Sequence, residues 1–212
     1  MKTAELISAL AADTAPVKSA RVIGPLAGAC LLGAFVTGVV LVTWLGLRPL
    51  GEAVQTSAFW MKAGYTSALA LAGFLLAIRL ARPGGRPGRV LTIALLAVVA
   101  MVGLSAIEMS RAQPGTMRSL WMGHTWSVCS LRILALSIPV YFGSILALRQ
   151  LAPTRLAIAG AAAGLLAGGV GASVYGLYCA ETSAMFVVIW YTLGIAASAV
   201  LGAVIGSRLL RW

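Results

Sequence analysis

Six long apolar runs constrain this chain more than any other feature of its sequence. They cover residues 22–47, 58–80, 90–109, 128–148, 155–178 and 184–206, with short polar connections between them. A transmembrane α-helix needs about 20 consecutive apolar residues, which each run supplies. The chain is also 60% hydrophobic over 212 residues, more than a soluble domain of this length could bury in one core. The sequence therefore predicts an all-α polytopic membrane protein with six transmembrane helices.

The first apolar run is too long for a cleaved signal peptide, whose apolar region is about 7 to 15 residues. A second run follows it closely, so we interpret the first as a true membrane span. The chain then divides into a cytoplasmic N-terminal segment, residues 1–21, and a six-helix transmembrane domain, residues 22–212.

The placement of lysine and arginine predicts the orientation. Of the 16 basic residues, 11 fall in or beside the N-terminal segment, the second and fourth connections and the C-terminus. Only three fall in the other connections. Because cytoplasmic loops carry the excess of basic residues, both termini are expected on the cytoplasmic side of a bacterial inner membrane. The basic residues that give the net charge of +11 are therefore interpreted as signals for orientation in the lipid bilayer. No surface that combines aromatic and basic residues is predicted, so direct binding of nucleic acid is not expected.

Small residues recur at every fourth position in the last two runs. They are Gly160, Gly164, Gly168, Ala172 and Gly176 in the fifth run, and Gly194, Ser198, Gly202 and Gly206 in the sixth. Such stripes let two helix backbones approach closely, and a serine in the stripe can add a hydrogen bond between the helices. We expect the two spans to form a close antiparallel hairpin whose tip carries Cys179 and Glu181.

Two of the three cysteines are expected at the non-cytoplasmic face. Cys129 begins the fourth span and Cys179 ends the fifth, whereas Cys30 lies inside the first span and is expected to act as a small apolar residue. The periplasmic side of an inner membrane is oxidising. The sequence is compatible with three states of Cys129 and Cys179: a disulfide, a shared metal ion, or simple burial as free thiols.

The surroundings of these two thiols differ. Cys129 lies near a helix N-terminus with Arg132 one turn further on, and both features favour a thiolate. Cys179 lies near a helix C-terminus with Glu181 close by, which favours the neutral thiol. We therefore expect Cys129 to be the more reactive thiol and Cys179 to be its resolving or co-ligating partner.

The stretch WMGHTWSVCS, residues 121–130, adds the only histidine of the chain. A soft site of Cys129, Cys179 and His124, with Glu181 as a fourth group, has ligand types that suit zinc or softer ions. His124 and Cys129 are five residues apart, about 140° around a continuous helix, so they chelate together only if the helix starts after His124. The alternative is an interfacial histidine beside tryptophans of an aromatic belt. We expect no required cofactor and at most a transient metal ion.

Three further charged residues, Lys62, Glu108 and Arg132, are expected near the same outer face. There they could form a layer of ion pairs. A small transporter more often places a charge or a broken helix at the midplane, and a membrane thiol oxidoreductase normally needs a CxxC or two cysteine pairs. Both functions remain alternatives, but the residues point to a protein that is not an enzyme.

The N-terminal stretch MKTAELISALAAD predicts a short amphipathic helix. Thr3 can cap it, and Leu6, Ile7 and Leu10 form one apolar face before Asp13. This face suits either an interfacial anchor or a docking helix for a soluble partner.

Several stretches together resemble the NrsF-type membrane anti-sigma factors. They are MKTAELISALAAD, LRPL after the first span, AFWMK, LWMGHTWSVCSLRI, LRQLAPTRLAIAGAAAGLLAGG, YCAE and WYTLGIAASAVLGAVIGSRLLRW. The resemblance covers nearly the whole chain at comparable spacing, and the two cysteine-bearing stretches and the C-terminal run agree together.

This resemblance implies a six-span inner-membrane protein that holds an extracytoplasmic-function sigma factor inactive. It also implies release of the sigma factor under metal or oxidative stress sensed by two cysteines, to which Cys129 and Cys179 correspond. The face of Leu6, Ile7 and Leu10 would then dock the sigma factor. One departure is that Tyr178 stands where the family often has histidine, which removes one candidate ligand and favours thiol redox chemistry over metal binding.

Overall fold

The computed structural model describes residues 3–12, 20–82, 85, 88–113, 115–151 and 153–211. Throughout these ranges the regular structure is helical, as the apolar runs predicted. The six long helices are α2 (Ala20–Trp44), α4 (Ser57–Leu80), α5 (Val90–Arg111), α7 (Trp126–Arg149), α8 (Leu156–Tyr175) and α10 (Thr192–Leu209). Six spans are long and apolar enough to cross a membrane, and the sixth of them, Ala184–Leu209, comprises α9, η1 and α10. The ends of the other five long helices agree with the predicted spans to within three residues.

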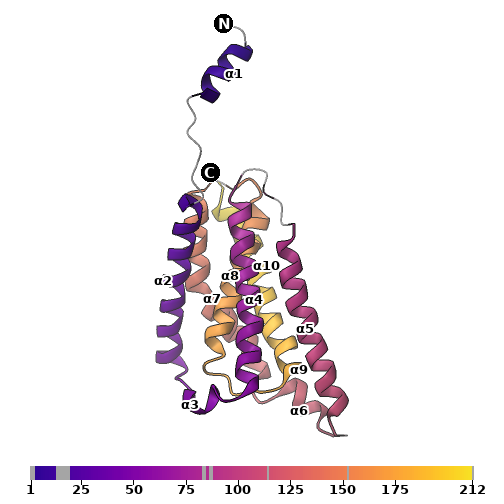
Figure 1. Ribbon diagram of the computed structural model, residues 1–212. Helices are drawn as coiled ribbons and strands as arrows, with labels where there is room; N and C mark the ends of the chain where they lie inside the picture. Colours follow the sequence, from indigo (N-terminus) through magenta and orange to yellow (C-terminus); the bar gives the residue numbers. More distant parts are fainter. Residues whose placement is uncertain are drawn as a thin grey trace.

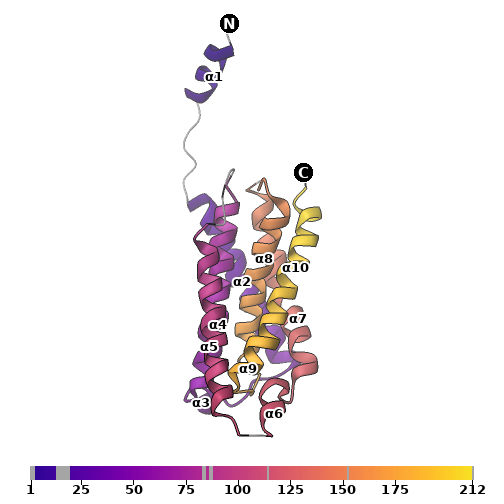
Figure 2. The ribbon, with the colours of Figure 1, turned by 90° about the vertical axis from the view of Figure 1, so that its right-hand side faces the viewer.

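Shorter elements complete the described chain. They are α1 (Thr3–Ala12), α3 (Leu50–Ala53), α6 (Met117–Met122), α9 (Ala184–Phe186) and the π-helical segment η1 (Val187–Tyr191), which joins α9 to α10. The chain runs up and down through the bundle, so the start of α2 and the end of α10 lie at the same end (Figures 1 and 2). We call this the terminal end. The opposite end carries α3, α6 and residues 176–183.

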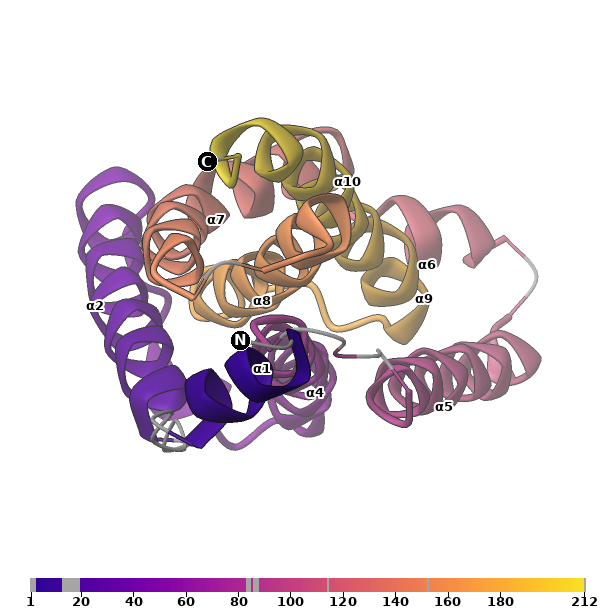
Figure 3. The same ribbon diagram turned by 90° about the horizontal axis from the view of Figure 1, so that it is seen from above.

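Helix α8 lies at the centre of the bundle. It packs most extensively against α10, α4 and α7, and Figure 3 shows α2 and α5 at the periphery. The predicted small-residue contact with α10 is confirmed. A Cβ added to Gly160 or Gly164 would collide with a backbone carbonyl oxygen of α10, and one added to Gly206 would lie 2.6 Å from the Cα of Gly160. Glycine is therefore required for these two backbones to approach so closely.

The stripes differ from the prediction at three positions. Gly176 lies beyond the end of α8, and a Cβ on Gly194 would meet Ile133 of α7 at 3.0 Å. The Ser198 hydroxyl donates to the hydroxyl of Ser137 on α7 at 3.2 Å, so the predicted hydrogen bond from the sixth span reaches the fourth span and not the fifth. The reason is that α10 is packed against α7 as well as α8.

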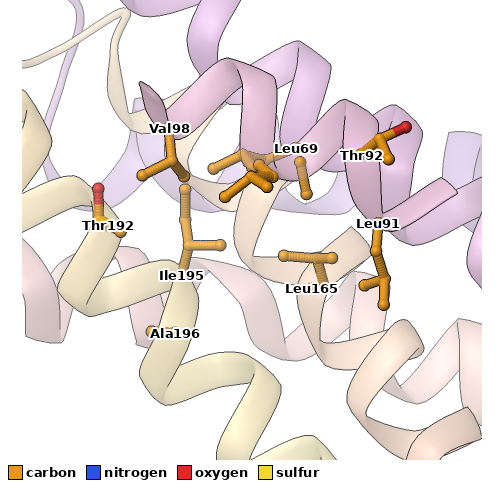
Figure 4. Close-up of a pocket in the computed structure, with 10 residues that line it drawn as sticks. Leu69, Leu91, Thr92, Val98, Leu165, Thr192, Ile195 and Ala196 are labelled. Atoms are coloured by element: carbon orange, nitrogen blue, oxygen red, sulfur yellow. The ribbon is translucent and has the colours of Figure 1, made fainter. Parts of the chain in front are cut away.

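An apolar cavity of about 510 Å³ separates α5 from α8 and α10 (Figure 4). Its lining residues are Leu69, Leu91, Thr92, Ala94, Leu95, Val98, Leu165, Thr192, Ile195 and Ala196. None of these side chains is ionisable, and two threonine hydroxyls are the polar groups among them. The cavity therefore offers no charged side chain for catalysis or for holding an ion.

Candidate thiol site at the opposite end of the bundle

The two cysteines of the predicted site belong to one buried cluster. Cys129 lies in the first turn of α7, and Cys179 lies in the segment 176–183 that joins α8 to α9. Their side chains are 0% and 1% exposed, and both thiols are free. Cys30 is half-buried in α2 and packs against a different apolar cluster. The fold thus gathers the two cysteines that the sequence selected and leaves the third apart.

Two tyrosine hydroxyls accompany the thiols. Tyr175, at the end of α8, and Tyr191, in η1, are both fully buried in the same cluster. The Tyr175 hydroxyl lies beside the Cys129 thiol, and the Tyr191 hydroxyl lies beside the Cys179 thiol. Neither hydroxyl makes a hydrogen bond of ideal geometry, but the Arg132 guanidinium also lies within reach of the Tyr175 hydroxyl. The two thiols and the two hydroxyls therefore form one buried polar group inside an otherwise apolar cluster.

The π-helical segment positions the second tyrosine. A π-helix holds one extra residue per turn, is rare, and occurs most often at functional sites. The Ser130 hydroxyl on α7 donates to the carbonyl oxygen of Trp190 at 2.8 Å, which joins η1 to the turn of α7 that carries Cys129. This contact fixes Tyr191, the next residue, against the thiol cluster.

Lys62 attaches the cysteine-bearing segment to α4. Its side chain is only 2% exposed, and its ammonium donates to the carbonyl oxygens of Cys179 at 2.9 Å and Glu181 at 2.5 Å. A buried ammonium in a membrane protein is costly and marks a functional site by default. Here it binds two backbone oxygens, so Lys62 fixes residues 179–181 against α4.

Glu181 attaches the same segment to α7. Its Oε1 atom accepts the backbone N–H groups of His124 at 2.7 Å and Thr125 at 3.2 Å, immediately before α7 begins. A carboxylate is favourable at this position because a helix N-terminus carries partial positive charge. Gly123 makes room for it, since a Cβ there would lie 2.6 Å from Oε2 and the residue has a φ of 53°. The segment that carries Cys179 therefore caps the helix that carries Cys129.

The predicted layer of ion pairs is wrong, although Lys62, Glu108 and Arg132 do lie at the same end of the bundle. Within the described chain each has a different partner. Glu108 accepts the hydroxyl of Ser183 at 2.9 Å and the N–H of Met185 at 3.0 Å, which secures α9 to α5. The Arg132 guanidinium lies over the ring of Tyr178, 5.4 Å from its centroid, and donates to its hydroxyl at 3.4 Å. The charges bind backbone groups and an aromatic ring because the segment 176–185 lies between them.

The other residues of the predicted metal site do not come together around one point. The His124 residue is exposed, and its backbone rather than its imidazole binds Glu181. Among the described residues, no three His, Cys, Asp or Glu side chains gather closely enough to hold a metal ion. The four-group metal site is therefore not assembled in this structure, and metal binding by Cys129 and Cys179 alone stays a prediction. Burial of both thiols also leaves their predicted order of reactivity a prediction.

Tyr175, Tyr191 and the backbone partners of Lys62 were not predicted from the sequence. A tyrosine inside an apolar span is a detectable signal, because its hydroxyl needs a partner when buried. The sequence does not predict which group each tyrosine contacts, because Tyr175 precedes the segment that carries Cys179 and Tyr191 follows it.

The N-terminal helix forms as α1 over Thr3–Ala12, as predicted. The side chain of Ile7 is 62% exposed and free to contact a partner. The side chains of Leu6 and Leu10 lie outside the described part of the structure, as does Asp13. The docking role of this face stays a prediction.

Comparison with known proteins agrees with the cysteine-bearing stretches. The family model described as negative regulator of sigma F, NrsF, matches residues 10–212. The anti-sigma-F factor NrsF of Caulobacter vibrioides is 40% identical over 222 aligned residues, which cover all of both chains. A probable anti-sigma-F factor NrsF of Azospira oryzae is 38% identical, again over the full length of both. No solved structure matches the chain. The match over nearly the whole length places this chain in the NrsF family of negative regulators of sigma F.

Proposed function

We propose that this chain is an inner-membrane anti-sigma factor. It holds an extracytoplasmic-function sigma factor inactive and releases it on metal or oxidative stress sensed by Cys129 and Cys179. The observation that supports the sensing role is the pair of free, buried thiols, each of which lies beside a buried tyrosine hydroxyl. Membership of the NrsF family supports the regulatory role, which requires no catalysis.

The orientation follows from the charges. Most of the basic residues lie at or near the terminal end of the bundle, so this end faces the cytoplasm by the positive-inside rule. The thiol site then faces the periplasm, where oxidants and metal ions arrive before they reach the cytoplasm. A bacterial inner membrane separates the sensor from the transcription machinery, and the six helices connect the two.

The cytoplasmic contact with the sigma factor is made by α1. An amphipathic helix can place its apolar face in a groove of a soluble partner, and Leu6, Ile7 and Leu10 share such a face by spacing. Ile7 is exposed and available for this contact. In the chain, α1 directly precedes the first span, α2.

The transmission step begins at the segment 179–181. In the resting state Lys62 holds this segment on α4 and Glu181 holds it on the start of α7. Oxidation of the thiols, or a metal ion bound between them, changes the space they occupy and so displaces the segment. Because α4 and α7 both run from this end to the terminal end, the displacement changes the arrangement at the cytoplasmic face.

Removal of residues 1–15 tests the docking step. The detergent-solubilised full chain is expected to retain its sigma factor during purification, whereas the shortened chain is expected to lose it. A Leu47→Ala variant of the full chain, changed at the opposite end of the bundle, serves as the control and should retain the partner. Equal recovery of the sigma factor with and without residues 1–15 contradicts the docking role of α1.

A further inference from the structure

Three methionines share a second small cavity at the opposite end of the bundle. The cavity is about 220 Å³ and is lined by Met109, Met117 and Met185, together with Leu120 and Trp121. The methionines come from three different elements, the end of α5, the start of α6 and α9. Three of the seven methionines in the chain therefore line the same cavity, outside the buried thiol cluster.

The ligand chemistry of this cavity is soft. Thioether sulfur prefers soft ions such as Cu(I) and has little affinity for hard ions, which prefer oxygen. An indole ring adds attraction for a cation through its electron-rich face. Methionine is also a common filler of apolar gaps. Met109 is 40% exposed and Met117 is 50% exposed, so an ion can reach both side chains from outside the bundle.

Hydrogen bonds hold the walls of the cavity in place. The carboxylate of Glu108 accepts the backbone N–H of Met185 at 3.0 Å, which joins α9 to the residue next to Met109. The indole N–H of Trp190 donates to the carbonyl oxygen of Trp121 at 2.7 Å, which joins α6 to η1. The three elements that carry the methionines are thus attached to the same part of the bundle before any ligand binds, as a binding site requires.

The local charge is compatible with a cation. Glu108 is adjacent to Met109 in the chain and its carboxylate contacts Met185, so a negative charge lies beside two of the methionines. Arg111 and Arg118 are the nearest basic residues along the chain, and both are exposed. A monovalent ion also needs less compensating charge than a divalent one.

We propose that the cavity of Met109, Met117 and Met185 binds one soft monovalent cation of the Cu(I) or Ag(I) class. This site is separate from the thiols and goes beyond their sensing role. Met185 follows the segment 179–181 closely in the chain, so occupation of the cavity stiffens the part of the molecule that carries Cys179.

Titration of a cysteine-free chain with Ag⁺ tests the site directly. The background is Cys30→Ser, Cys129→Ser and Cys179→Ser in detergent, which removes every thiol. We expect one Ag⁺ per chain by calorimetry, and we expect Met109→Leu or Met185→Leu to weaken the affinity by about tenfold or more, as loss of a ligand does. Leucine keeps the side-chain volume, and Met101→Leu, buried higher in α5, is the matched control that should bind as the background does.

Three results overturn the site. They are a folded cysteine-free chain that binds no Ag⁺, equal affinity in Met109→Leu and Met101→Leu, and Zn²⁺ binding as tight as Ag⁺ binding. If the cysteine-free chain does not fold, the same titration is made with the thiols intact. The Met109→Leu, Met185→Leu double variant must then bind one Ag⁺ fewer than Met101→Leu, and equal stoichiometry overturns the site in that case too.

Discussion

At the residue scale, one lysine supports the cysteine-bearing segment. The Lys62 ammonium donates to two carbonyl oxygens from residues of the segment, Cys179 and Glu181, in a largely buried setting. A hydrogen bond from a charged donor contributes about 1.5 to 3 kcal/mol, and a buried acceptor left without a donor costs a similar amount. Lys62 is therefore the side chain whose loss frees the segment most directly.

A Lys62→Met variant keeps the length of the side chain and removes its donors. We expect it to lower the free energy of unfolding by about 1 to 3 kcal/mol, because both carbonyl oxygens lose their partner. We also expect a maleimide to label Cys129 and Cys179 faster. Denaturation in detergent and mass spectrometry of the labelled chain measure the two effects. The control is Arg118→Met, at an exposed position of the same end. If the cysteines of Lys62→Met are labelled no faster than those of Arg118→Met, Lys62 does not support the segment.

A Glu181→Gln variant removes the charge that caps α7 and keeps the shape. The amide oxygen still accepts hydrogen bonds, but the favourable interaction of a carboxylate with a helix N-terminus, about 0.3 to 1 kcal/mol, is lost. A small decrease in unfolding free energy and faster labelling of Cys129 are the expected results. Glu52→Gln, exposed on α3 at the same end, should change neither quantity. Identical behaviour of the two variants contradicts the capping role.

At the scale of elements, the close contact of α8 and α10 sets the frame of the bundle. A Cβ on Gly164 would collide with the carbonyl oxygen of Ser198, whereas a Cβ on Gly103 in α5 meets nothing within 4 Å. Alanine at Gly164 would test the steric requirement of the contact, whereas alanine at Gly103 would test only the intrinsic preference of a helix for alanine.

The pair Gly164→Ala and Gly103→Ala is expected to give opposite signs. Gly164→Ala should destabilise by about 1 to 3 kcal/mol, because the packed backbones must separate. Gly103→Ala should be neutral or stabilise by about 0.5 to 1 kcal/mol, since alanine loses less conformational freedom in a helix. Thermal unfolding in detergent compares the two, and a Gly164→Ala chain as stable as Gly103→Ala refutes the close contact.

The elements were largely predictable from the sequence, whereas the contacts between them were not. Span length and four-residue periodicity are local signals, so the six helices and the small-residue face of α8 could be recognised. The groups that Lys62, Tyr175 and Arg132 contact lie on other elements, and no local sequence pattern predicts which elements come together. The expectation that opposite charges pair failed for this reason, because backbone groups of the segment 176–185 were nearer than the charged side chains.

At the scale of the whole molecule, the two ends of the bundle carry different features. The opposite end holds the thiols, the tyrosine hydroxyls and the methionine cavity, while the terminal end holds both termini and α1. This division fits a protein that detects chemistry on one side of a membrane and binds a protein on the other. Such a protein must have its thiol end on the periplasmic side of the membrane.

Single-cysteine reporters check that orientation. In intact cells carrying the cysteine-free chain, Arg118→Cys at the opposite end should react with a membrane-impermeant maleimide. Arg155→Cys at the terminal end should react only after the cells are opened. The reverse pattern places the thiol site in the cytoplasm and contradicts the account. The residues are exposed in the structure, so access to the reagent is decided by the membrane.

Release of the sigma factor by thiol chemistry tests the central claim most directly. The full chain and its sigma factor are purified together in detergent and treated with Cd²⁺ or diamide, and the sigma factor that remains bound is quantified. The account predicts that the unmodified chain loses its partner after treatment, whereas Cys129→Ser and Cys179→Ser chains retain it both before and after. Release from the serine variants as complete as from the unmodified chain, or no sigma factor bound to the unmodified chain at the start, contradicts the account.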